Sequence, residues 1–242
     1  MNIYETRKLL DEYLLFHYGG PEEVLPWDFG PRGALGFAVR TVSELRDPAR
    51  VIKTALDLGC AVGRSSFELA AAGAEVTGID FSSAFITAAN ELQRTGRLDY
   101  ERHDEAAAKT KLIAKAPANL PRERVRFETG DAMDLRGDLG AFDIVHAANL
   151  LCRLPEPEKL LARLPYLVRP GGQLLLATPC TWLEEFTPRA HWPVGSTRDW
   201  LREKLSADFE LDLQLDMPFL IREHARKFQW SVALGTRWIR KL

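Results

Sequence analysis

Three acidic residues stand where an apolar segment of the chain gives way to small residues. Asp57 lies in the run ALDLGCAVGR, Asp80 follows the run EVTGI, and Asp131 lies in the run GDA. A carboxylate only accepts hydrogen bonds, so it suits ribose hydroxyls and positively charged amines. We predict that these three carboxylates belong to one small-molecule site.

The turn after Asp57 carries the residues that a ligand-binding backbone needs. Gly59 and Gly63, with Ala61 between them, permit positive φ and close approach to a ligand. A helix that begins near Arg64 offers free N–H groups. Dinucleotide-binding folds share such turns, but Asp57 would repel a pyrophosphate and attract an ammonium group. Nicotinamide dinucleotide binding, and a fold whose pocket has lost its ligand, stay open as weaker interpretations.

Short apolar strands alternate with helices through the middle of the chain, which predicts an α/β fold with a doubly wound, mostly parallel sheet. The carboxyl ends of parallel strands share one edge of the sheet, where ligands bind. The predicted strands are Lys53–Leu58, Glu75–Ile79, Val125–Thr129, Phe142–Ala147 and Gln173–Thr178. The predicted helices are 37–46, Arg64–Ala72, Ser82–Thr95 and Glu158–Leu167.

The two ends of the chain and one internal segment depart from this alternation. Residues 3–18 predict an amphipathic helix that closes as a lid, and residues 19–36 an ordered flap rich in Gly, Pro and aromatic residues. The polar segment 99–121 predicts an inserted helix or a surface excursion. From residue 197 we expect a helix and then two strands. Those strands form an antiparallel hairpin that completes a seven-stranded sheet.

Composition excludes several classes of protein. The 242 residues have 46% hydrophobic content and a net charge of −2, so disorder and an overall field for nucleic acid are not expected. The N-terminal segment lacks the apolar core of a signal peptide, and no apolar run spans a membrane. Cys60, Cys152 and Cys180 do not make a disulfide framework or a metal site. We expect a cytoplasmic protein with no metal, no membrane and no nucleic-acid partner.

We expect residues 1–242 to form a single domain with three parts. Residues 51–180 are the predicted cofactor-binding core. Residues 1–50 are the predicted lid and substrate region, and residues 181–242 the predicted substrate wall and closing hairpin. The oligomeric state does not follow from the sequence.

The series Asp57, Gly59, Ala61, Gly63 resembles the first motif of the class I S-adenosylmethionine-dependent methyltransferases, an acidic residue followed by Gly-x-Gly-x-Gly. The turn at 170–172 (PGG) is also typical of that class. The resemblance implies a Rossmann-like methyltransferase fold, S-adenosyl-L-methionine as cofactor and S-adenosyl-L-homocysteine as product. The cofactor-binding residues that it implies are Asp57, Gly59, Cys60, Ala61, Gly63, Arg64, Asp80, Phe81, Asp131, Ala132 and Asn149.

Longer strings support a narrower resemblance. They are YETRKLLDEYLLFHYG, VLPW, LDLGCAVGRSSFELA, GIDFS, AANLLCRLPEP, TPCTWLEEFTP and PFLIREHARKFQW. Together they resemble the methyltransferase domain of ovothiol biosynthesis, which methylates a ring nitrogen of 5-thiohistidine (4-mercaptohistidine) to give ovothiol A. In many organisms that domain is fused behind a sulfoxide synthase domain. The resemblance therefore implies a small amino-acid substrate and a functional link to a sulfoxide synthase.

A zwitterionic imidazole substrate needs a cation, an acceptor and an aromatic wall. Arg153 suits the carboxylate, and Asn149 suits an imidazole or ammonium because it both donates and accepts. An aromatic ring beside a sulfonium or imidazolium gains cation–π attraction. Ordinary roles, in a loop, a turn or the core, stay open for each. The predicted substrate-binding residues are Trp27, Phe29, Asn149, Arg153, Thr181, Trp182, Glu185 and His224.

The reaction is an in-line displacement at the sulfonium methyl carbon. In the thiolate–imidazolium form of the acceptor one ring proton leaves, and the sequence decides neither whether a base is needed nor which group it is. Glu184, Glu185, a tyrosine or water is the candidate base. Tyr4 lies on the predicted lid helix. The predicted catalytic residues are Asn149, Arg153, Glu184 and Tyr4. Two alternatives stay open: a methyltransferase for another small amine or thiol, and a protein that binds S-adenosylmethionine without catalysis.

Overall fold

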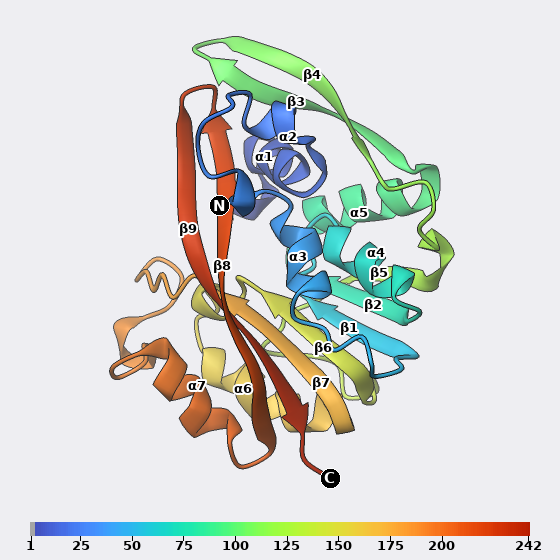
Figure 1. Cartoon of the computed structure of the whole chain (residues 1–242), viewed down its shortest axis with the longest axis vertical. Helices are drawn as coiled ribbons and strands as arrows, with labels where there is room; N and C mark the ends of the chain where they lie inside the picture. The colour runs from blue at the N-terminus through green and yellow to red at the C-terminus, as the bar shows by residue number, and fades with distance from the viewer. Residues whose placement is uncertain (1–2) are drawn as a thin grey trace.

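The computed structural model describes residues 3–242, and its main element is a seven-stranded sheet (Figure 1). The strand order is β5-β2-β1-β6-β7-β9-β8. The first five strands in this order, β5, β2, β1, β6 and β7, run parallel. Strand β9 is antiparallel to both of its neighbours, β7 and β8. The predicted α/β fold with a closing antiparallel hairpin is confirmed. The strands are β1 (Thr54–Leu58), β2 (Glu75–Asp80), β5 (Val125–Thr129), β6 (Phe142–Ala148), β7 (Val168–Thr178), β8 (Phe209–His224) and β9 (Lys227–Arg240).

Alternate residues of the central strands enter two separate hydrophobic clusters, as the two-residue period of a strand requires. Ala55 and Ile144 belong to the cluster that includes side chains of α1, α3, α4 and α5. Leu56 and Val145 belong to the cluster that includes α6 and α7. The helices are α1 (Arg7–Tyr18), α3 (Phe37–Ser43), α4 (Arg64–Ala71), α5 (Ser83–Thr95), α6 (Pro157–Leu167) and α7 (Thr197–Leu205).

The expected lid helix over 3–18 is divided. A 3₁₀ turn, η1 (Ile3–Glu5), comes first, and α1 begins after Thr6, whose hydroxyl accepts a hydrogen bond from the Leu9 N–H at 3.4 Å. Threonine caps a helix in this way because it fills an orphan donor of the first turn. The flap that follows contains α2 (Pro21–Val24) and η2 (Arg32–Ala34).

The segment 99–121 is where the sequence prediction was wrong in part. It is a surface excursion, but it holds an antiparallel hairpin, β3 (Arg97–Glu105) and β4 (Ala108–Lys115), in place of a helix. The alternation that forms the hairpin is visible in burial, since Tyr100 and Ala114 are buried whereas Asp99, Ile113 and Lys115 beside them are exposed. Charged residues on both strands hide this period. In Figure 1 the hairpin arches over α1 and α2. A 3₁₀ turn, η3 (Arg122–Arg124), leads into β5.

Several smaller differences concern element ends. The turn at 170–172 lies inside β7, which already begins at Val168, and the pairing of β6 with β7 shifts register there. Further 3₁₀ turns are η4 (Leu151–Arg153) and η5 (Arg189–His191). Within residues 3–242, no helix combines the length and the apolar character that crossing a bilayer requires.

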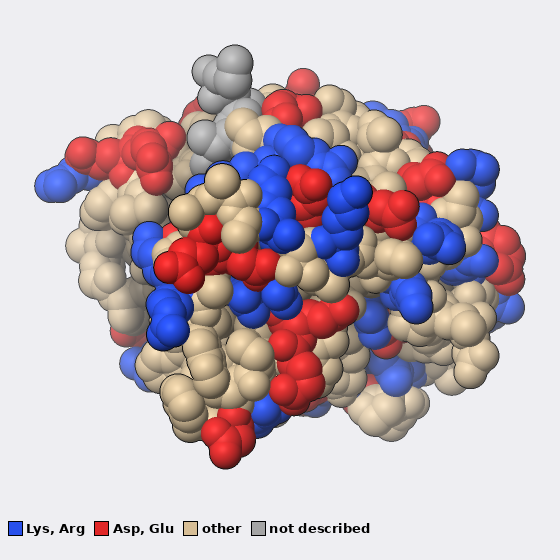
Figure 2. Space-filling view, turned by 90° about the horizontal axis from the view of Figure 1, so that it is seen from above, with Lys and Arg blue, Asp and Glu red and all other residues tan. Residues whose placement is uncertain are grey.

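Charged side chains of both signs are mixed on the face shown in Figure 2. Charged side chains of the β3–β4 hairpin form ion pairs, such as the exposed pair of Lys109 and Glu101 at 2.9 Å and the half-buried pair of Arg102 and Asp104 at 2.7 Å. Exposed pairs of this kind add little to stability but cancel each other's field. The pairing fits the small net charge of the chain.

Candidate functional site

A cavity of about 480 Å³ opens at the carboxyl edge of the parallel strands. Its lining combines the turn after β1, the ends of β2, β5 and β6, the helix α1, the loop after β7 and one residue of β8. Apolar and aromatic side chains form most of the wall, with a few polar groups between them. Ligand sites of α/β proteins have this place and this composition.

The turn after β1 has three consecutive odd positions with positive φ: 68° at Gly59, 47° at Ala61 and 85° at Gly63. A Cβ at Gly63 would lie 2.5 Å from the Phe127 ring, so only glycine fits there. Ala61 tolerates this conformation at an energetic cost, and such strain concentrates at ligand sites. Gly59, Cys60 and Ala61 of this turn line the cavity.

Asp80 ends β2 and fixes that turn. Its Oδ2 accepts a hydrogen bond from the Ala61 N–H and its Oδ1 one from the Ser82 N–H, both at 2.9 Å. Burial raises the pKa of Asp80 to about 6, although the two N–H donors act in the opposite direction. Each oxygen keeps a lone pair for a further donor, so the carboxyl suits vicinal hydroxyls of a ribose.

Asp131 and Phe81 form the wall beside Asp80. The Asp131 Oδ1 accepts a hydrogen bond from the Met133 N–H at 2.8 Å. Phe81 is 65% exposed although it borders the cavity, so its ring offers a free face. With Ala132 on the same wall, this part of the cavity has the shape and chemistry for a flat heterocycle.

Asp57 lies deeper, and both of its oxygens have partners. Oδ1 lies 2.7 Å from the His146 Nδ1, and Oδ2 accepts a hydrogen bond from the Ser66 hydroxyl at 2.6 Å. Asp57 and His146 are each 1% exposed. The carboxyl thus reaches the cavity as part of a hydrogen-bonded chain.

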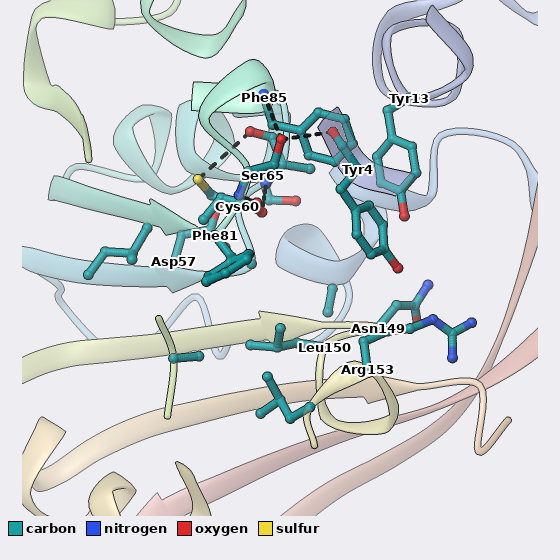
Figure 3. A pocket seen from close by; sticks show the side chains of 18 of the residues that line it. Tyr4, Tyr13, Asp57, Cys60, Ser65, Phe81, Phe85, Asn149, Leu150 and Arg153 are labelled. Carbon is teal, nitrogen blue, oxygen red and sulfur yellow. Dashed lines mark hydrogen bonds between the residues drawn. The ribbon is translucent and has the colours of Figure 1, made fainter. Parts of the chain in front are cut away.

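The opposite end of the cavity is aromatic and carries charges of both signs. Tyr4 lies between Tyr13, at a ring distance of 6.4 Å, and Phe186, at 6.3 Å. The Arg153 guanidinium stacks over Phe186 at 4.7 Å, and its NH1 donates to the Thr181 carbonyl at 3.1 Å. In Figure 3 the tyrosine hydroxyls point toward Arg153. Burial raises the pKa of Tyr4, while the nearby Arg153 acts in the opposite direction.

Asn149 connects the two ends of the cavity. It follows β6 with φ at 55°, and its N–H donates to the Ala177 carbonyl at 2.7 Å. Its Oδ1 is buried without a hydrogen-bond partner among residues 3–242. A strained residue with an unpaired buried acceptor indicates a position selected for a ligand.

Most of the predicted cofactor residues therefore line one cavity, and two do not. Arg64 lies outside the lining and forms an ion pair with Glu68 at 2.8 Å. Gly63 also lies outside it and acts on the turn through its conformation. The predicted residues that line the cavity at this end are Asp57, Gly59, Cys60, Ala61, Asp80, Phe81, Asp131, Ala132 and Asn149.

The predicted acceptor residues divide more evenly. Tyr4, Asn149, Arg153 and Glu185 line the cavity. Thr181 contributes only its carbonyl to Arg153, and Glu184 turns away to pair with Arg189.

The remaining candidates lie elsewhere. Trp27 stacks on Phe29 at 5.6 Å near the tip of the β8–β9 hairpin, where it also contacts Phe228. The Trp182 Nε1 donates to the Thr197 hydroxyl at 2.9 Å, and its ring packs in the α6–α7 cluster. The His224 ring contacts His103.

Several lining residues were not assigned to the site from the sequence. Tyr13, Phe16 and His17 lie on one face of α1 and line the cavity. Their spacing of three and four residues indicates a shared helix face, which could have been assigned to the sheet edge from the sequence. Phe85 and Phe186 gave no such signal, because only the folded chain brings them to Tyr4. Across residues 3–242 no group of three or more His, Cys, Asp or Glu side chains is arranged to hold a metal ion.

Residues 56–174, about half of the chain, match a family model described as a methyltransferase domain. The matched range includes the turn after β1, Asp80, Asp131, Asn149 and Arg153. It leaves out α1, the loop after β7 and the β8–β9 hairpin. The family match therefore covers the end of the cavity lined by Asp57, Asp80 and Asp131, which we call the cofactor end. It covers only part of the opposite end, lined by Tyr4, Tyr13 and Arg153, which we call the acceptor end.

Relatives with curated names cover a similar part. A ubiquinone biosynthesis O-methyltransferase of Coxiella burnetii is 29% identical over 126 residues, 52% of this chain and 43% of that protein. A trans-aconitate 2-methyltransferase of Deinococcus radiodurans is 33% identical over 135 residues, 54% of this chain and 40% of that protein. The chain thus aligns with less than half the length of these relatives.

A solved structure of an S-adenosylmethionine-dependent methyltransferase from Methanosarcina mazei shares the fold. The TM-score is 0.55 at 18% sequence identity, over 80% of this chain and 94% of that one. The family match makes residues 56–174 a methyltransferase domain, and the likeness to the solved structure shows the shared fold. The residues of this domain fit S-adenosylmethionine as cofactor. The buried Asn149 Oδ1 lacks a hydrogen-bond donor, and the Asp80 carboxylate can accept further hydrogen bonds.

Proposed function

We propose that this chain, whose residues 56–174 are a methyltransferase domain, uses S-adenosylmethionine to methylate a small zwitterionic acceptor, a ring nitrogen of 5-thiohistidine, to give ovothiol A. One observation carries the proposal: Arg153 and Glu185, of opposite charge, line the same cavity, and Arg153 stacks on Phe186, the residue that follows Glu185. A free amino acid with a flat ring presents a carboxylate, an ammonium and a π face. Those three groups match a guanidinium, a carboxylate and the tyrosine rings.

The resemblance of the longer strings supports the choice of acceptor. Four of those strings each contribute lining at the acceptor end: Tyr4 and Tyr13 from the first, Asn149 and Arg153 from AANLLCRLPEP, and Glu185 from TPCTWLEEFTP. The string PFLIREHARKFQW contributes Ile221. Three of the four lie outside the residues that match the general methyltransferase model. The most individual parts of the sequence thus meet at the acceptor end.

The cofactor, when bound, supplies a methyl group on a sulfonium. In the transfer the sulfur–methyl bond breaks, a nitrogen–methyl bond forms, and the ring proton leaves to a base. Glu185 and Tyr4 are the predicted candidates that line the cavity, whereas Glu184 is paired with Arg189 outside it. The thiolate of the acceptor is also nucleophilic, so Arg153 and Asn149 would select the nitrogen by orienting the ring.

A methyl-transfer assay tests the proposal directly. The purified protein is incubated with S-adenosylmethionine and 5-thiohistidine, and mass spectrometry is expected to find a product heavier by one methylene group. Histidine, small phenols and small thiols serve as competing acceptors. Turnover of one of those, without turnover of 5-thiohistidine, refutes the acceptor and leaves the methyltransferase assignment intact.

Two alternatives have distinct outcomes in the same assay. The curated relatives are named as methyltransferases for other small molecules, so another small amine, thiol or hydroxyl acceptor is the first alternative. A protein that only binds the cofactor would bind S-adenosylhomocysteine by calorimetry and methylate nothing in the panel. The resemblance also leads us to propose that a sulfoxide synthase supplies the thiohistidine precursor.

A further inference from the structure

Asp57 and His146 form a buried pair on the side of the sheet that α3 and α4 cover. They are paired in register on β1 and β6. Each lies two residues beyond Ala55 or Ile144, so both side chains are on the same face of the sheet as those two residues. Asp57 is one of the residues labelled in Figure 3. Both side chains line the cavity that holds the proposed cofactor site.

The partners of Asp57 determine which nitrogen of His146 carries the proton. A carboxylate accepts only, and it already accepts from the Ser66 hydroxyl at 2.6 Å. The His146 Nδ1, 2.7 Å from the other oxygen, is therefore the donor. In the neutral ring this leaves the lone pair on Nε2.

The His146 Nε2 lacks a partner. It is buried and makes no hydrogen bond within residues 3–242, although the ring lines the cavity. The His17 Nδ1, on the same cavity wall, is also buried and unpartnered in that part of the chain. Burial lowers the pKa of His17 to about 4, so this second ring is neutral at physiological pH. Buried acceptors without donors indicate a ligand that donates.

The charge of the ligand group follows from Asp57. Both hydrogen bonds to this buried carboxylate come from a hydroxyl and an imidazole, and no Lys or Arg side chain of residues 3–242 forms an ion pair with it. A ligand carboxylate would be repelled here. A protonated amine carries several N–H donors and a positive charge. It can therefore donate a hydrogen bond to the His146 Nε2 and is attracted by the negative charge of Asp57.

We propose that the His146 Nε2 accepts a hydrogen bond from the α-ammonium group of the cofactor's methionine moiety, with Asp57 holding the ring in the required tautomer. The inference rests on the proposed function, because it takes S-adenosylmethionine as the ligand. The pair lies just below the turn after β1, while the acceptor residues Arg153 and Glu185 line the other end. Asp57 then acts on the ammonium through His146 and through its field.

Calorimetry with two ligands tests this assignment. S-adenosylhomocysteine carries the ammonium, and 5′-methylthioadenosine lacks the whole amino-acid end. His146→Asn keeps a donor near Asp57 and removes the acceptor. We expect it to weaken S-adenosylhomocysteine about tenfold or more and to change the affinity for methylthioadenosine by less than about twofold. His146→Gln, which places an amide oxygen near the Nε2 position, is expected to recover most of the lost affinity.

The controls separate binding from folding. His191→Asn, at a surface turn that does not line the cavity, should leave both affinities unchanged, and far-ultraviolet circular dichroism reports whether each variant is folded. Equal weakening of both ligands by His146→Asn, or no weakening of either, overturns the inference. If the unaltered protein binds no S-adenosylhomocysteine, the proposed function itself fails.

Discussion

The two ends of the cavity are built in different ways. The cofactor end comes from turns that directly follow β1, β2 and β5, and it uses backbone groups as much as side chains. The acceptor end is made of side chains from α1, the loop after β6, the loop after β7 and β8, which lie far apart in sequence. We therefore expect changes at the first end to act through the backbone and the stability of the fold. Changes at the second should act through binding and turnover alone.

The largest effect is expected from Gly63→Ala. The new methyl group would lie 2.5 Å from the Phe127 ring, at a φ of 85° that alanine adopts reluctantly. We expect the free energy of unfolding to fall by about 2–4 kcal/mol, with loss of S-adenosylhomocysteine binding. Urea unfolding and calorimetry measure the two quantities. Gly137→Ala, where a Cβ would meet nothing within 4 Å, is the control. If Gly63→Ala were as stable and as competent as that control, the cofactor end would not depend on its backbone.

Arg153→Ala is the corresponding change at the acceptor end. The change removes the cation at the acceptor end and its stacking on Phe186. We expect kcat/KM for the acceptor to fall about 100-fold, while the S-adenosylhomocysteine Kd changes less than about twofold. Steady-state kinetics and calorimetry on the same preparation give both numbers. Equal losses in both would mean that the two ends are not separate.

Two adjacent glutamates provide a matched pair. Glu185 lines the cavity, whereas Glu184 pairs with Arg189 outside it. Glu185→Gln is expected to lower kcat/KM about 10- to 30-fold, because it removes an acceptor for the ammonium or for the ring proton. Glu184→Gln is expected to change it less than about twofold, as an exposed ion pair contributes little. The opposite ranking would reassign the acceptor wall.

The smallest predicted effect is a pH dependence at the cofactor end. The folded, free protein has Asp80 with a pKa of about 6, and ribose hydroxyls donate best to the charged carboxylate. Binding should therefore lower this pKa, release a proton and strengthen as the pH rises through 6. We expect the S-adenosylhomocysteine Kd to be up to about tenfold weaker at pH 5 than at pH 7. Asp80→Asn should flatten this profile, and a profile of unchanged slope in that variant would assign the titration to another group.

The same contrast explains what the sequence predicted. Asp57, Asp80 and Asp131 were identified from neighbours in the chain, because a parallel sheet brings strand ends together whatever the loops do. The acceptor end depends on which face of each loop turns inward, and no local pattern encodes that. Trp182 was expected at this end, yet it packs into the α6–α7 cluster through its contact with Thr197.

The errors in the fold have similar causes. The predicted lid helix ignored the capping preference of Thr6, so Tyr4 was placed on the wrong element although it does reach the cavity. The hairpin β3–β4 was missed because Arg102 and Asp104 occupy positions that an ordinary strand would give to apolar residues. Asp104 pairs with Arg102 on the same strand and also with Arg222 of β8, a partner that lies more than a hundred residues away.

The β8–β9 hairpin has a consequence for how the protein is made. Arg222 donates to the Glu23 carbonyl across a separation of 199 residues, and Ile221 beside it completes the cavity wall. A ribosome delivers the N-terminal segments and the parallel strands long before this hairpin emerges. Because contacts of such long range form slowly, we expect the turn after β1 to assemble before this hairpin closes the acceptor end. Synthesis thus sets the order in which the two ends become competent.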